Sequence, residues 1–289
     1  MKFWVSGGLV PAEAARVSVL DHGFTVGDGV FETLKAVLDP EFGVAPFAMD
    51  RHVARLAQSA AGMGLQAPDR DEVRTAVLAV CAANPELADG ARIRVTLSSG
   101  SGPLGSDRNP GAATLAVTCA PAAPWPAAST VALSPWPRNE RSALVGLKTT
   151  SYAENVLALA RAKSLGAGEA VLGNLASRLC EGTGSNVFVV RDALVSTPAL
   201  ATGCLAGITR ALVLEWCADA GISAVEGDEP LADLASADEV FLTSSTRDVH
   251  PVERILDIDG ERLWSRDVWP VTEQIAKVFA ARAGESWNP

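Results

Sequence analysis

Lys148 is the residue whose type and position point most directly to covalent chemistry. The chain has only five lysines, and Lys148 stands between an apolar segment, 144–147, and the expected start of a helix. Tyr152, the only tyrosine, follows four residues later. A lysine at such a junction can be desolvated so that its pKa falls, which an amine that forms a Schiff base requires. The alternative is a surface lysine near a helix N-terminus, and the spacing alone leaves both open.

Two segments could bind an anion. Gly207 precedes the expected start of a helix at Ile208 and Thr209, and Ser244–Thr246 is a run of hydroxyls after an expected strand. The N–H groups of a helix N-terminus and a nearby hydroxyl accommodate a phosphate well. Either segment alone is more often a helix cap or a turn. The glycines of segment 182–186 lead into a strand, which excludes a dinucleotide-binding fingerprint.

Glu181 is a candidate partner for a cofactor ring. A carboxylate that faces a pyridine nitrogen keeps this nitrogen protonated and makes the ring an electron sink, whereas the alternative is an ordinary loop carboxylate. The five cysteines and three histidines are scattered along the chain without the spacing of a metal site. We therefore expect buried free thiols and no metal.

The composition is that of a globular protein with a large core and small-molecule partners. The 289 residues are 48% hydrophobic and carry a formal net charge of -10, with 24 basic against 34 acidic side chains. This balance argues against nucleic acid and anionic membranes as partners. No stretch approaches the roughly 18 apolar residues that a membrane-spanning helix needs. We expect a cytoplasmic protein.

Strand and helix patterns alternate along the chain and predict an α+β fold in two domains. Three prolines within residues 119–129 indicate an interdomain linker there, so we expect a small N-terminal domain over 1–118 and a larger C-terminal cofactor-binding domain over 130–289. The predicted strands are 2–5, 30–37, 92–97, 114–118, 131–134 and 239–243. The predicted helices are 50–63, 71–81, 152–165, 208–220 and 271–282. Hairpins are predicted to turn at Gly173–Asn174, Arg191–Asp192 and Asp259–Gly260.

Six blocks of the sequence, in order, resemble the class IV aminotransferases, which are fold type IV pyridoxal-phosphate enzymes. They cover nearly the whole chain: DHGFTVGDGVFETLKA (21–36), HVARLAQSA (52–60), LKTTSYAENVLALARAKSLGAGEAVL (147–172), CEGTGSNVFVV (180–190), LAGITRALVLE (205–215) and ADEVFLTSSTRDVHPV (237–252). The resemblance implies a small N-terminal α+β domain, a larger barrel-like α/β domain, a pyridoxal 5'-phosphate cofactor between them, and a homodimer.

The resemblance also implies a role for particular residues. Lys148 would hold the cofactor covalently and then carry protons, with Tyr152 near the phenolic oxygen, Glu181 at the ring nitrogen and Leu205 packed on the ring. The cofactor phosphate would be bound by Arg55, Ile208, Thr209 and Ser245.

Two departures argue against the branched-chain members of the family. Phe31–Lys35 and Arg92–Val95 lack the usual branched-chain motifs, and the chain looks most like aminodeoxychorismate lyases. The leading hypothesis is therefore a lyase that converts 4-amino-4-deoxychorismate to 4-aminobenzoate and pyruvate. The alternatives are an aminotransferase for a D-amino acid, a branched-chain amino acid or an amine, and a non-catalytic binding module. Pro103–Leu104 replaces the usual arginine of the loop that follows, so we assign the substrate carboxylate to Arg94, with help from Ser244 and Thr246.

Overall fold

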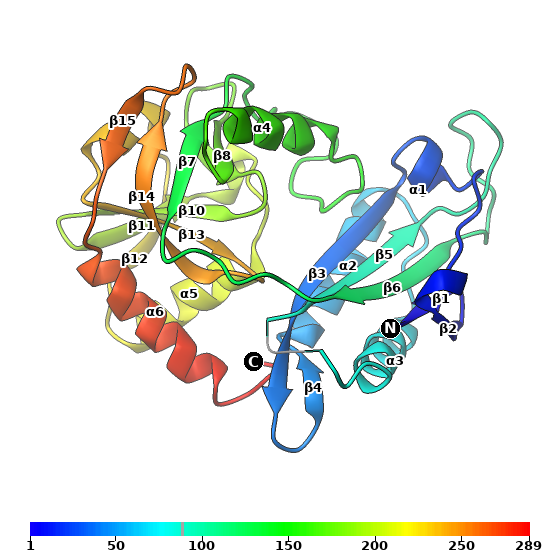
Figure 1. The fold of residues 1–289 in the computed structure, drawn as a ribbon. Helices are drawn as coiled ribbons and strands as arrows, with labels where there is room; N and C mark the ends of the chain where they lie inside the picture. Colours follow the sequence, from blue (N-terminus) through cyan, green and yellow to red (C-terminus); the bar gives the residue numbers. More distant parts are fainter. Residues whose placement is uncertain (88–89) are drawn as a thin grey trace. The chain divides into compact units, whose positions relative to one another are not determined.

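The computed structural model describes residues 1–87 and 90–289, which form two compact units (Figure 1). Unit 1 comprises residues 1–123, 147–152 and 286–289, and unit 2 comprises residues 124–146 and 153–285. The linker prediction began too early, because the last strand of unit 1 continues to Ala120, opposite Arg92. Pro121, which has no N–H to donate, follows directly. The predicted boundaries also missed the two short segments that return to unit 1.

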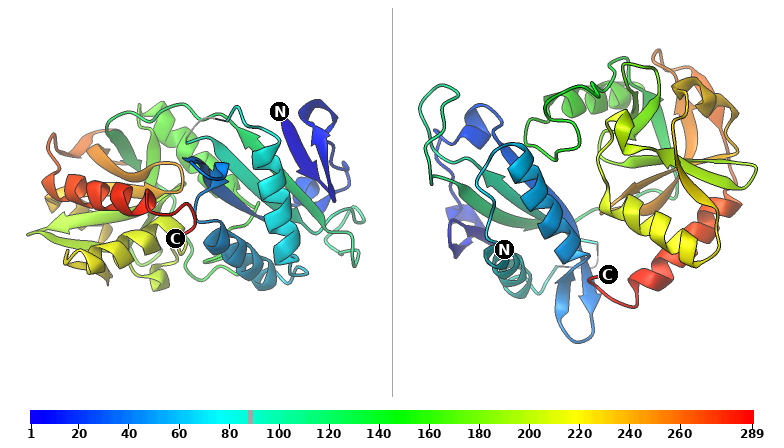
Figure 2. Two further views of the ribbon diagram at one scale, coloured as in Figure 1. Left: turned by 90° about the horizontal axis from the view of Figure 1, so that it is seen from below. Right: turned by 180° about the vertical axis from the view of Figure 1, so that it is seen from behind.

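Unit 1 contains one six-stranded antiparallel sheet in the order β2-β1-β6-β5-β3-β4. Two amphipathic helices, α2 and α3, cover one face of this sheet (Figure 2). The elements are β1 (Lys2–Val5), β2 (Gly8–Pro11), α1 (His22–Thr25), β3 (Gly29–Asp39), β4 (Gly43–Pro46), α2 (Met49–Gly62), α3 (Arg70–Ala82), β5 (Arg92–Ser98) and β6 (Thr114–Ala120).

Strand β3 carries different side chains on its two faces. Val30, Leu34 and Ala36 belong to the core that α2 and α3 complete. Phe31 alternates with them and therefore lies on the opposite face. Glu32 shares the core face and is 1% exposed, so a carboxylate occupies a position that the strand pattern reserves for apolar residues.

Unit 2 contains a mixed nine-stranded sheet in the order β12-β11-β10-β13-β14-β7-β8-β9, with β15 paired to β14. Parallel pairs join β14 to β7 and β7 to β8, whereas β10, β13 and β14 are antiparallel neighbours. Helix α4 packs on β7 and β8, and helices α5 and α6 pack on the β13–β14 side (Figure 1). The elements are β7 (Ser129–Leu133), α4 (Ala153–Ser164), β8 (Glu169–Gly173), β9 (Leu179–Gly182), β10 (Asn186–Arg191), β11 (Leu194–Pro198), α5 (Ile208–Asp219), β12 (Ala224–Gly227), β13 (Glu239–Ser244), β14 (Asp248–Leu256), β15 (Arg262–Ser265) and α6 (Pro270–Ala283).

The predicted α+β class is confirmed, and the departures are local. The hairpin predicted to turn at Arg191–Asp192 turns one residue later, at Asp192 and Ala193, which both have positive φ. Two left-handed residues match the twist of a tight hairpin. The turn predicted at Gly173–Asn174 spans residues 174–178 instead. Sequence patterns missed the short strands β2, β4 and β12, which, unlike β1, have glycine or proline at their ends.

The five cysteines are free and buried, as predicted. Among the described residues, no helix has both the length and the apolar character needed to cross a membrane.

Candidate active site

Lys148 is held against the edge of β3 by its backbone. The Lys148 carbonyl accepts a hydrogen bond of 2.9 Å from the Phe31 N–H, and the Thr150 N–H donates to the Gly29 carbonyl over 2.8 Å. The Lys148 N–H donates to the Ser59 hydroxyl on α2 at 3.2 Å. Lys148 therefore belongs to unit 1, on a short segment fixed by both a strand and a helix.

The ring of Phe31 brings together three of the predicted site residues. The Lys148 Nζ lies 4.6 Å from the ring centroid, and the Arg94 Cζ lies 3.8 Å from it. The Tyr152 ring meets Phe31 edge-on, with centroids 5.4 Å apart. Arg94 is positioned by β5, where its Nε donates to the Thr96 hydroxyl at 3.2 Å. An amine, a guanidinium and a phenol thus surround the Phe31 ring.

Arg55 lies in a buried cluster with Glu32 and His52. Its Nε donates to Glu32 Oε1 over 2.8 Å and its Nη2 to Glu32 Oε2 over 2.7 Å. His52 Nδ1 lies 2.6 Å from Glu32 Oε2, and it must be the donor because an ionised carboxylate only accepts. His52 and Arg55 are three residues apart and share a face of α2. The sequence reasoning assigned Arg55 to a phosphate and missed both of these partners.

The protonation states of Glu32 and His52 depend on their burial and on the charges of the neighbouring residues. Burial raises the pKa of Glu32, but the charge of Arg55 and the hydrogen bonds from Arg55 and His52 outweigh it and lower this pKa from 4.5 to about 2. Burial lowers the pKa of His52 below its ordinary value. The charge of Glu32 and its hydrogen bond to His52 raise this pKa, whereas the charges of Arg55 and Lys148 lower it further. At neutral pH the cluster is therefore an ionised Glu32–Arg55 pair with an uncharged histidine.

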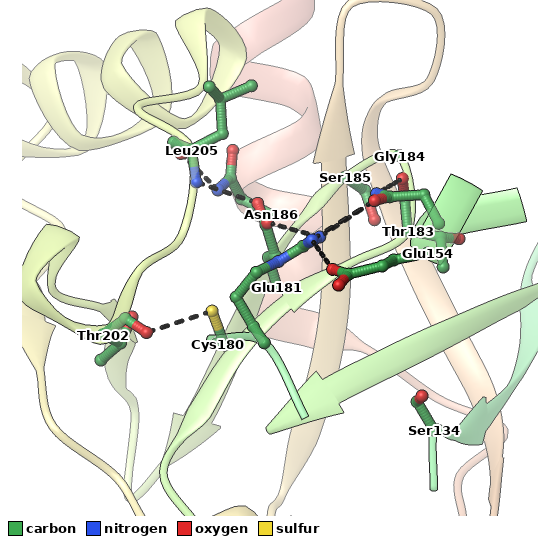
Figure 3. Close-up of polar contacts among 12 residues, drawn as sticks. Ser134, Glu154, Cys180, Glu181, Thr183, Gly184, Ser185, Asn186, Thr202 and Leu205 are labelled. Carbon is green, nitrogen blue, oxygen red and sulfur yellow. Dashed lines mark hydrogen bonds and ion pairs between the residues drawn. The ribbon is translucent and has the colours of Figure 1, made fainter. Parts of the chain in front are cut away.

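In unit 2, Glu181 is fixed on β9 by two partners (Figure 3). Its Oε2 accepts a hydrogen bond of 2.9 Å from the Leu205 N–H, and its Oε1 lies 3.1 Å from Arg138 Nη2. Arg138 is in turn oriented by the Asn155 side-chain oxygen at 3.3 Å. The carboxylate is thus fixed in position by a backbone N–H and a guanidinium. The sequence patterns contained no signal for Arg138.

The predicted phosphate residues of unit 2 lie at a helix N-terminus and at a turn. Ile208 and Thr209 begin α5, whose N-cap residue Gly207 supplies no side-chain hydrogen bond. A Cβ on Gly207 would lie 1.9 Å from the Asn186 Oδ1, so a larger residue there would displace the Asn186 side chain. Ser245 lies in the turn that joins β13 to β14.

Two hydroxyls beside that turn are suited to a polar ligand. The side-chain oxygens of Thr243 and Ser244 are buried and have no hydrogen-bond partner among the described residues. Thr243 pairs with Asn186 across β10 and β13, and Asn186 contacts the start of α5 through Gly207. The Thr243 hydroxyl therefore lies on the side of the sheet that carries Asn186 and faces the start of α5, whereas Ser244, the next residue of the strand, points to the other side.

Comparisons with known proteins place these features in one family. The family model for class IV amino-transferases matches residues 29–255. The branched-chain-amino-acid aminotransferase of Pseudomonas aeruginosa is 32% identical over 288 residues, 96% of this chain and 91% of that protein. The D-alanine aminotransferase of Listeria monocytogenes is 29% identical over 295 residues, 96% of this chain and 95% of that protein.

Solved structures agree with the sequence relatives. The branched-chain aminotransferase of Thermoproteus uzoniensis, determined with norvaline, has a TM-score of 0.88 at 31% identity, covering 97% of this chain and 93% of that chain. A candidate 4-amino-4-deoxychorismate lyase from Legionella pneumophila has a TM-score of 0.84 at 22% identity, covering 93% of this chain and 96% of that chain. At that identity it shows the shared fold alone. The proteins of this family are pyridoxal-phosphate enzymes, so the alternative of a non-catalytic module is set aside. The chain belongs to the class IV aminotransferase family.

Proposed function

We propose that this chain is an aminotransferase that moves an amino group between an amino acid and a 2-oxo acid. The observation that carries the proposal is the pairing of Lys148 with Arg94 on the ring of Phe31. The lysine offers an amine for covalent chemistry, and the guanidinium offers a planar fork for a carboxylate. Relatives named as branched-chain and D-alanine aminotransferases support this reading over the lyase expected from the sequence.

The residues present fit pyridoxal 5'-phosphate. Lys148 would hold the cofactor covalently and Glu181 would bind its ring nitrogen, with Leu205 and Tyr152 against the ring. The N-terminus of α5 and the unpartnered Thr243 hydroxyl near the end of β13 are suited to its phosphate. In this proposal the phosphate is bound by Ile208, Thr209, Ser245 and Arg55. The bound cofactor supplies an electron sink that stabilises negative charge at the substrate carbon.

The side chains of the site would divide the remaining work. Lys148 Nζ would remove the proton from the carbon that carries the amine and return it to the product, as a general acid and base. Glu181 would keep the ring nitrogen protonated, and Arg138, whose Nη2 lies 3.1 Å from Glu181 Oε1, would hold the carboxylate in place. Glu32 and His52 would hold the guanidinium of Arg55 in one orientation through the contacts at 2.6 to 2.8 Å.

The substrate carboxylate is assigned to Arg94, with Ser244 and Thr246 as further contacts. Arg94 is exposed on the face of β5 that also carries Thr96, and its stacking on Phe31 pre-orders the guanidinium. This arrangement suits an α-amino acid, because the carboxylate and the reacting carbon are then bound by different groups.

The test compares transamination with the lyase reaction. Purified protein loaded with pyridoxal phosphate is given single amino acids and 2-oxoglutarate, and the amino acid products are quantified. We expect donor-dependent formation of glutamate. Release of 4-aminobenzoate from 4-amino-4-deoxychorismate, without transfer to any 2-oxo acid, would overturn the proposal in favour of the lyase.

We also propose that the chain acts as a homodimer. Val19, Phe24 and Leu104 in unit 1 are 74%, 76% and 87% exposed. His22 joins two of their segments, since its Nε2 lies 2.8 Å from the Pro103 carbonyl oxygen. Large apolar side chains gathered on a surface are typical of an interface. Light scattering should give twice the chain mass, and a fully active monomer would contradict the proposal. A cytoplasmic location remains a prediction from the sequence.

A further inference from the structure

A buried ion pair in unit 2 lies directly beside the turn that carries Ser245. Arg247 ends this turn, and its side chain is 8% exposed. Its guanidinium forms an ion pair with Glu169, which is 1% exposed, and lies 4.0 Å from the ring centroid of Trp125. The side chain is therefore enclosed between a carboxylate and an aromatic ring.

Each partner of Arg247 also binds a backbone segment. The Trp125 indole N–H donates to the Thr246 carbonyl over 2.8 Å, which fixes the turn from a second direction. Glu169 Oε1 accepts hydrogen bonds from the Gly184 N–H at 2.7 Å and the Ser185 hydroxyl at 2.8 Å. The turn after β13, the turn after β9 and the segment before β7 are thus joined through three side chains.

The geometry constrains the turn more than a surface contact would. A buried charge is tolerated only with its partner, so Arg247 cannot leave Glu169 without a large cost in free energy. A planar guanidinium also fits the face of Trp125 in a way that a flexible ammonium does not. The position of Thr246, and with it that of Ser245, is consequently tied to a buried ion pair and the ring stacked on it.

We propose that the Glu169–Arg247 pair, stacked on Trp125, positions the Ser245 turn and thereby sets the affinity of this chain for the phosphate group of its cofactor. Arg247 is a positioning residue that acts through Ser245. The inference rests on the proposed function, in which Ser245 binds that phosphate.

The experiment measures dissociation constants of the apoenzyme for pyridoxal phosphate and for pyridoxal, which lacks the phosphate. We expect Arg247→Met to weaken binding of pyridoxal phosphate at least tenfold and to leave binding of pyridoxal within twofold. Arg254→Met, which removes an exposed arginine from β14, is the matched control and should change neither constant. Ser245→Ala reports directly on the phosphate contact and should lose affinity for pyridoxal phosphate alone.

A second variant tests whether a loss of affinity in Arg247→Met comes from misfolding around the unpaired Glu169. Glu169→Gln/Arg247→Met leaves no unpaired buried charge, and the glutamine oxygen can still accept from Gly184 and Ser185. It should show the same selective loss. The inference is overturned if the Arg247 variants lose affinity for pyridoxal phosphate and for pyridoxal to the same extent. It is also overturned if both Arg247 variants bind pyridoxal phosphate as wild type does while Ser245→Ala binds it more weakly. If Ser245→Ala also binds normally, the phosphate assignment in the proposed function fails and the inference fails with it.

Discussion

Replacing Glu32 with glutamine should destabilise unit 1 by about 3 kcal/mol at neutral pH. The pKa of Glu32 falls from 4.5 to about 2 on folding, and each pKa unit corresponds to about 1.4 kcal/mol. Breaking a buried ion pair by removing one partner costs roughly 3 to 5 kcal/mol in other proteins, which agrees. Because the pKa is lowered in the folded state, this stability is present above pH 4.5 and is lost as the pH falls toward 2.

Urea unfolding, followed by amide hydrogen exchange in peptides from β3 and α2, would read the free energy of unit 1 separately from unit 2. Wild type and Glu32→Gln should differ by about 3 kcal/mol at pH 7, and the gap should close between pH 5 and pH 2 as Glu32 becomes protonated. Glu41→Gln, at an exposed position of unit 1, is the control and should match wild type throughout. A difference below about 1 kcal/mol at pH 7, or one that persists at pH 2, would refute the reasoning.

Three further predictions concern activity. Lys148→Ala should abolish covalent attachment of the cofactor, measured by absorbance and by mass spectrometry after borohydride reduction, and should lower turnover by several orders of magnitude. Lys163→Ala, at an exposed position of α4, should leave both unchanged. Glu181→Gln should lower kcat at least a hundredfold in steady-state assays while the protein keeps bound cofactor, because a neutral amide does not hold the ring proton. Arg94→Leu should raise KM for the 2-oxo acid at least tenfold with a smaller change in kcat, and an unchanged KM would place the carboxylate elsewhere.

The candidate site was predictable where a residue type is rare or its sequence context is unusual. Lys148 stood out because lysine is scarce and because it lies between an apolar segment and a helix, and the structure brings Tyr152 and Arg94 to the same ring. Their functional roles remain predictions. The position of Glu32 was a further signal in the sequence, because a carboxylate among the core-facing residues of a strand needs a buried partner. We made no use of it in predicting the site.

Other contacts depend on packing that no local pattern records. Arg138 reaches Glu181 only after β7 and β9 take their places in the sheet, and Arg247 meets Glu169 across 78 positions of sequence. The helices α2, α3 and α5 were predicted to within one or two residues because each repeats its apolar face over several turns. The four-residue strands β2 and β12 carry glycine or proline at their ends and lack the apolar run of β1, so their pairing partners define them instead.

Unit 1 is built from stretches of chain that are synthesised at very different times. Its sheet is complete by Ala120, but the hydrogen bonds from β3 to the Lys148 segment await residues 147–152. The N–H of Ala48, just before α2, donates to the Trp287 carbonyl at 2.7 Å, and the Asp50 N–H donates to the Asn288 side chain at 3.0 Å. A nascent chain emerges N-terminus first, so this unit can acquire its full hydrogen bonding only after nearly all 289 residues exist. A product that ends before residue 147 would carry the sheet without Lys148. Under the proposed function, covalent binding of the cofactor would then mark the molecules whose translation continued past Lys148.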